Sequence, residues 1–85
     1  MTPYRVFIEA RVLAALRELK RSEQQRILRL FEHLGRNPFQ QGDYAEHDEV
    51  GRPVQVLVLN RHAVVFWADH PVKEVKILDL KPAGN

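Results

Sequence analysis

Residues 61–69 read RHAVVFWAD, and residues 73–80, just beyond a short break, read KEVKILDL. Both stretches are rich in β-branched and aromatic residues, which are enriched in strands, and a proline marks the break between them as a turn. They therefore predict the last hairpin of an antiparallel sheet. Because side chains alternate along a strand, Phe66 and Trp67 are expected on opposite faces of that sheet. The charges of the second stretch suit a strand that helices cover only in part.

A further strand is predicted immediately before this hairpin. Residues 53–60 read PVQVLVLN, with Val54, Val56 and Val58 on one face and apolar residues on the other as well. A tight turn near Asn60 joins this strand to the next. Strands that are apolar on both faces are expected where helices cover one side and a partner, or the chain's own segments, shields the other.

The first half of the chain is predicted to be mainly helical. Residues 4–10 (YRVFIEA) favour a short strand, and residues 11–19 (RVLAALREL) have the apolar spacing of a helix. Ser22 is a good N-cap, and Gln25 completes a capping box, so a second helix is expected to follow. Gly35, followed soon by a proline, is expected to end it.

The segment 37–53, NPFQQGDYAEHDEVGRP, is turn-rich and acidic, and we interpret it as a loop with a short strand around residues 44–48. The element order β-α-α-β-β-β predicts a single α+β domain over residues 1–85. In this fold a helical hairpin packs on one face of an antiparallel-dominated, four-stranded sheet.

The composition restricts the chemistry and the setting. The chain has 85 residues and no cysteine, which excludes disulfides and thiolate chemistry. The N-terminus lacks the long apolar run of a signal peptide, and no segment is long and apolar enough to predict a membrane span. The expected location is the cytoplasm.

The charge is unevenly distributed. The net charge is only +2, but residues up to 41 contain eight Lys/Arg against four Glu, and later residues contain five Lys/Arg against seven Asp/Glu. A basic helical surface can meet phosphate or an acidic partner, although it can equally be an ordinary solvated face. One hypothesis is direct nucleic-acid binding by Arg17, Arg26, Arg29 and Arg36.

Three motifs together carry a family resemblance. They are the helix exit LGRNPFQQGDY at 34–44, the strand pair GRPVQVLVLNRHAVVFWAD at 51–69, and the closing strand KEVKILDLKPA at 73–83. Their order and spacing resemble the RelE/ParE superfamily of toxins from bacterial type II toxin–antitoxin modules. The resemblance implies a small toxin that is neutralised by a cognate antitoxin, whose extended or helical tail wraps it.

The resemblance implies two activities for such a toxin. RelE-like members bind the ribosomal A site and cleave mRNA without a metal, whereas ParE-like members inhibit DNA gyrase. The leading expectation is therefore a metal-independent endoribonuclease that acts on ribosome and mRNA, needs no cofactor and does not bind membranes. The alternatives are a non-nucleolytic member that binds gyrase or only the antitoxin, and a plain dimeric interaction domain. A homodimer or a toxin–antitoxin hetero-oligomer is expected accordingly.

RNA cleavage through the 2′-OH needs a base near that hydroxyl, cations on the phosphate and a donor to the leaving oxygen. The resemblance implies basic residues on the central strands for these roles. Here Gln55 and Leu57 occupy the third-strand positions, and Ala63 stands where the fourth-strand arginine is expected. The cleavage set is therefore partial.

Four residues remain as catalytic candidates: Arg52, Arg61, His62 and Lys81. Histidine side chains ordinarily titrate near neutrality, so His62 could serve as a general acid or base, although a lone histidine at a strand edge is more often a plain surface residue. The run EHDE at 46–49, with His70 elsewhere, suggests a metal site. Its spacing resembles no known metal site, so no metal is predicted.

Overall fold

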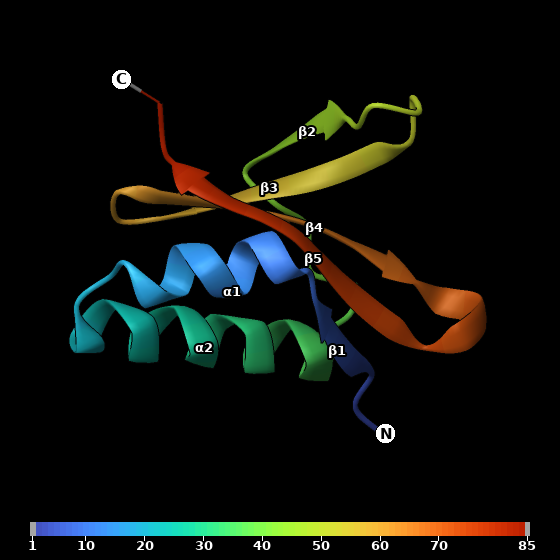
Figure 1. Ribbon diagram of the computed structural model, residues 1–85. Coiled ribbons are helices and arrows are strands. Elements are labelled where there is room, and N and C mark those ends of the chain that lie inside the picture. Colours follow the sequence, from blue (N-terminus) through green and yellow to red (C-terminus); the bar gives the residue numbers. More distant parts are fainter. Residues whose placement is uncertain (1, 85) are drawn as a thin grey trace.

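The predicted last hairpin lies at the centre of the sheet. The computed structural model describes residues 2–84. Its helices and strands are β1 (Arg5–Ile8), α1 (Ala10–Arg17), α2 (Arg21–Arg36), β2 (Tyr44–His47), β3 (Pro53–Leu59), β4 (His62–Asp69) and β5 (Glu74–Pro82), with a 3₁₀ turn at His70–Val72 (Figure 1). The strand order is β1-β5-β4-β3-β2. Only the pair β1–β5 is parallel, and the other three pairs are antiparallel. The predicted α+β class and helical hairpin are confirmed.

The sheet has five strands rather than the expected four, because the short strand predicted within the acidic segment 37–53 pairs with β3. Tyr44 faces Val56 in this register. Just before β2, the Asp43 backbone N–H donates to the carbonyl of Val56 at 2.7 Å, and the Asp43 carboxylate accepts from the N–H of Val58 at 2.7 Å. A Cβ on Gly42 would lie 2.5 Å from the same carbonyl of Val56. Glycine therefore allows the close approach on which this fifth strand depends.

The main core lies between the helices and one face of the sheet. Side chains of α1 and α2 meet alternate side chains of β4 and β5, as the 3.6-residue and two-residue periods require. Its buried members are Val12, Leu16, Ile27, Phe31, Leu34, Val64, Phe66, Val75, Ile77 and Leu80.

A smaller apolar cluster lies on the opposite face, which the helices leave uncovered (Figure 1). Val54, Val56, Ala63 and Val65 are buried there, and Trp67 packs beside them. The predicted division between Phe66 and Trp67 is thus confirmed, with Phe66 in the helix-side core. We call this uncovered surface the open face.

The helix ends differ in detail from the expectation. The N-cap of α2 is Lys20, whose N–H is 3.4 Å from the Glu23 carboxylate, so the predicted Ser22 cap is wrong. The turn between the helices is short, and the side chain of Gln24 donates to the carbonyl of Leu16 at 2.6 Å, which ties the two helices together. Helix α2 thus begins earlier in the chain than the local capping signals indicate, and a hydrogen bond to the preceding helix accompanies this earlier start.

Gly35 is the penultimate residue of α2 and not its terminator. Its carbonyl accepts from the N–H of Tyr4 at 2.8 Å, and a Cβ at this position would lie 2.9 Å from the Val6 side chain. The glycine therefore serves close packing of α2 against the first strand. As predicted, the helix stops just before the Asn37–Pro38 pair.

Candidate functional site on the open face

A bulge in β5 shapes the open face. Val65 pairs with Asp79 and the adjacent Phe66 pairs with Ile77, so Leu78 is an extra residue between the two pairs. Such a bulge breaks the strict alternation of a strand. As a result Leu78 and its neighbour Asp79 both line a cavity on the open face.

This cavity has a volume of about 380 Å³. We call it the open-face cavity. Its floor is apolar, and its rim comes from β2, the loop 48–52, β5 and the start of α1. The lining residues are Glu9, Arg11, Glu46, His47, Asp48, Glu49, Val50, Arg52, Val54, Val65, Leu78, Asp79 and Lys81. Five carboxylates and three Lys/Arg side chains are among them, so the cavity is acidic overall.

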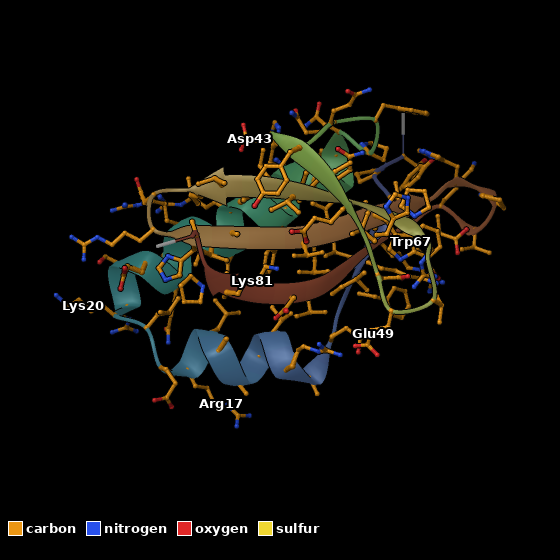
Figure 2. The ribbon with its side chains drawn as sticks, turned by 90° about the horizontal axis from the view of Figure 1, so that it is seen from above. Arg17, Lys20, Asp43, Glu49, Trp67 and Lys81 are labelled. Carbon is orange, nitrogen blue, oxygen red and sulfur yellow. The ribbon has the colours of Figure 1, made fainter. Side chains whose placement is uncertain are left out.

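Two of the four predicted catalytic residues, Arg52 and Lys81, line this cavity. Each is already paired with a carboxylate: Arg52 Nη2 is 2.8 Å from Asp48 Oδ2, and Lys81 Nζ is 3.5 Å from Glu46 Oε1. Figure 2, which looks onto the open face, shows Lys81 on the sheet, with Trp67 and Glu49 farther toward the other end of the strands. The cavity therefore brings together cations that are locally neutralised.

Arg52 is held in place by the loop before β3. The Asp48 carboxylate accepts from the backbone N–H of Arg52 at 2.8 Å, from its Nε at 2.9 Å and from the N–H of Val50 at 3.1 Å. These bonds lower the pKa of Asp48, the backbone bond from Arg52 most, and desolvation opposes them in part. The guanidinium carbon of Arg52 also lies 4.4 Å from the centroid of the Trp67 ring.

The other two candidates lie elsewhere. Arg61 is exposed in the two-residue turn between β3 and β4, where Asn60 adopts a φ of 57°. His62 is half-buried on the helix side and lines a very small cavity that includes Arg26 and Leu59. The structure therefore places His62 on the side of the sheet opposite Arg52 and Lys81.

The middle of the open face carries apolar side chains. The alternation predicted for β3 is confirmed, because Val54 and Val56 pack on the open face whereas Leu57 packs against the helix-side core. Ala63 is buried on the open face and pairs directly with Lys81. Its methyl group therefore stands where the family resemblance implies an arginine.

The side chains considered for a metal site do not come together. Glu46 faces Lys81 and Asp48 faces Arg52, as described above. His70 belongs to a separate aromatic cluster. Its ring stacks on Phe39 with the two ring centroids 4.5 Å apart, and its Nδ1 lies 3.0 Å from the hydroxyl oxygen of Tyr4. Among residues 2–84 no group of three or more His, Asp or Glu side chains is placed to hold a metal ion.

The sequence interpretation missed Glu9, Arg11 and Asp79 as members of the site. The first two are near the start of α1, and nothing in the local sequence places that helix end beside β2. Asp79 follows a bulge, and strict alternation would place it on the same face as Ile77. None of the described helices is long and apolar enough to cross a membrane.

Known structures have this fold, although no family model and no curated protein sequence matches the chain. A chain of an archaeal RelE–RelB complex from Pyrococcus horikoshii OT3 is 27% identical, with 100% of this chain and 99% of that chain covered and a TM-score of 0.81. Over its whole length the chain is thus similar to the RelE/ParE superfamily.

More distant RelE/ParE structures share the same fold. A chain of the RelBE2 toxin–antitoxin complex from Mycobacterium tuberculosis is 19% identical over 100% of this chain and 97% of that chain, with a TM-score of 0.79. A free E. coli RelE mutant is 12% identical over 95% of this chain and 84% of that chain, with a TM-score of 0.70. The family resemblance inferred from the three motifs is therefore confirmed.

Proposed function

We propose that this RelE/ParE chain is the toxin of a type II toxin–antitoxin module, which inhibits translation by ribosome-dependent mRNA cleavage in the cytoplasm. The observation that carries the proposal is the match to one chain of the archaeal RelE–RelB complex. The match covers 100% of this chain and 99% of that chain. A cognate antitoxin is the proposed neutralising partner.

Lys81 is the cation best placed to meet a phosphate on the open face. It stands beside Ala63, and its ion pair with Glu46 joins two side chains that are 43% and 40% exposed. An exposed pair of this kind contributes only about 0–1 kcal/mol, so a phosphate could replace Glu46 at small cost. Arg52 is fixed by Asp48 and Trp67, and its proposed part is to position the cavity wall.

Arg61 and His62 are placed beside the exposed end of the β3–β4 hairpin. Arg61 is exposed and could contact RNA that extends past the end of the sheet. His62 would have to act from the helix side, and a proton-transfer role requires RNA to reach around that end. The proposal therefore gives Lys81 and Arg61 the phosphate contacts and keeps His62 as the candidate acid or base.

A second candidate function is protein binding without cleavage, directed at the antitoxin or at DNA gyrase. The acidic balance of the open-face cavity favours it, because five carboxylates around three cations repel phosphate. The absence of a charged side chain at Ala63 points the same way.

Expression of the chain alone tests the shared part of both functions. We expect growth arrest in a bacterial host, and rescue when the protein encoded by the neighbouring reading frame is expressed together with it. Normal growth at high levels of soluble protein would contradict the toxin assignment.

Toeprinting on translating ribosomes separates cleavage from protein binding. We expect the wild type to cleave mRNA, and Lys81→Ala and Arg61→Ala each to reduce cleavage by about 10²–10³-fold, which is typical for removal of a phosphate-stabilising group. Lys73→Asn is the matched control, because Lys73 lies in the β4–β5 turn with a φ of 56° that asparagine tolerates.

The cleavage measured for each variant and for the wild type leads to a different conclusion. Unchanged cleavage in a variant would remove that residue from the reaction. Growth arrest without any cleavage by the wild type would favour the non-nucleolytic function.

A further inference from the structure

The open-face cavity has an apolar floor and a charged rim. Val54 and Val65 are only 2% and 7% exposed, and Leu78 packs against the same cluster. With a volume of about 380 Å³, the cavity can hold a few side chains but no folded domain. On the rim, Val50 is 82% exposed, which adds apolar surface that residues 2–84 leave uncovered.

The charges of the rim are not balanced within the protein. Two of the three cations, Arg52 and Lys81, are already paired with Asp48 and Glu46. The carboxylates left over are Glu9, Glu49 and Asp79, with Arg11 as the remaining cation. None of the ion pairs formed among residues 2–84 includes any of these four side chains.

This combination matches one kind of side chain. Lysine and arginine bury their methylene stems on apolar surface and hold a charged head at its edge. A floor of Val54, Val65 and Leu78 below the carboxylates of Glu49 and Asp79 offers both halves of such a contact. A nucleic-acid backbone would instead bring negative charge to a rim that is already acidic.

We propose that the open-face cavity docks a cationic segment of the antitoxin, with lysine or arginine side chains opposite Glu9, Glu49 and Asp79 and apolar side chains on the floor. The inference rests on the proposed function only in naming the antitoxin as the protein that carries the segment. The charge complementarity and the apolar floor are properties of this chain alone. Binding therefore weakens as salt is added.

The test compares two variants of equal net charge. Glu49→Gln/Asp79→Asn removes two carboxylates of the rim, and the new amide oxygen at position 79 can still accept from the N–H of Leu80, as Asp79 Oδ1 does at 2.8 Å. Glu18→Gln/Glu32→Gln removes two exposed carboxylates of the helical half and serves as the control. Thermal melts followed by circular dichroism establish that both variants are folded.

Two probes are titrated into each protein by calorimetry at about 50 mM and about 300 mM salt, a range over which screening of exposed charges changes substantially. One is the protein encoded by the neighbouring reading frame, and the other is a short peptide of alternating lysine and leucine. We expect both probes to bind the rim variant about tenfold or more weakly than the wild type, and the control variant equally well. The rim variant should also show the smaller salt dependence.

The outcomes separate the inference from the proposed function. Equal affinity of the neighbouring protein for the rim variant and the wild type overturns the docking site but leaves the toxin assignment standing. If that protein does not bind the wild type, the toxin assignment fails, and equal binding of the peptide to both variants then overturns the docking site as well. Displacement of the peptide from the wild type by single-stranded RNA would also overturn it, because the two would then share the cavity.

Discussion

At the residue scale, neighbouring aromatic side chains of β4 have different tasks. Phe66 is 2% exposed and belongs to the core beneath the helices. Trp67 packs on the open face between two cations, with Lys76 Nζ 5.1 Å and Arg52 Cζ 4.4 Å from its ring centroid. Its indole N–H is buried without a hydrogen-bond partner among the described residues. Trp67 therefore supports Arg52, which lines the open-face cavity, through its ring and not through its polar group.

We predict that Phe66→Ala lowers the free energy of unfolding by about 3–5 kcal/mol, because it leaves a cavity in the core. Phe39→Ala is the matched control, since Phe39 is 69% exposed and its removal should cost less than about 1 kcal/mol. Urea denaturation measures both values. Equal effects of the two substitutions would mean that Phe66 is not in the core.

At the scale of elements, the loop between β2 and β3 is organised by one carboxylate. The Asp48 carboxylate accepts hydrogen bonds from the backbone N–H groups of Val50 and Arg52 and forms an ion pair with the guanidinium of Arg52. Gly51 adopts a φ of 82°, which closes the turn. The same interactions lower the pKa of Asp48. A group whose pKa is lower in the folded state stabilises the protein above its unfolded pKa and loses that contribution as the pH falls through its folded pKa.

We predict that Asp48→Asn destabilises the protein at neutral pH, and that the difference from the wild type narrows below about pH 4, the ordinary pKa of an aspartate. Chemical denaturation at several pH values measures this difference. An NMR titration of the Asp48 carboxyl carbon checks the cause directly. A midpoint at or above the ordinary value for aspartate would contradict the role given to this loop.

At the scale of the whole molecule, the charges divide between the two sides. The helical half contains most of the basic excess, whereas the open-face cavity is acidic. Arg17 and Lys20 lie on the helical hairpin and point away from the sheet (Figure 2). None of the ion pairs in the described part of the chain uses an arginine of α1 or α2. The helical side is therefore the surface suited to a polyanion.

We predict that single-stranded RNA outside the ribosome binds this helical surface, separately from the phosphate contacts proposed for Lys81 and Arg61. Arg26→Gln/Arg29→Gln should weaken binding and reduce the salt slope by about 0.7 for each phosphate that the variant no longer neutralises. Fluorescence anisotropy with a labelled oligonucleotide at several salt concentrations measures both effects. Arg5→Gln is the control, because Arg5 lies on β1 and is paired with Glu74 at 3.1 Å. Salt-insensitive binding would rule out the helical surface as the RNA-binding site.

The sequence predicted the features that depend on local periodicity. The facing of Phe66 and Trp67, the sidedness of β3 and the order of the elements follow from side-chain alternation and helical spacing, which neighbouring residues determine among themselves. The candidate site was predicted less well. Arg52 and Lys81 do line one cavity, but His62 lies across the sheet from them, a separation that positions in the sequence do not reveal.

The sequence by itself thus determined the α+β class, the helical hairpin, the central hairpin and the resemblance to the RelE/ParE superfamily. Only the tertiary structure decided that β2 joins the sheet and that α2 begins before its best local cap. It also decided that a bulge in β5 orients Asp79 toward the acidic open-face cavity. The physical reason is the range of the interactions involved. Periodicity acts over a few residues, whereas strand register and bulges depend on hydrogen bonds and packing between segments far apart in the chain.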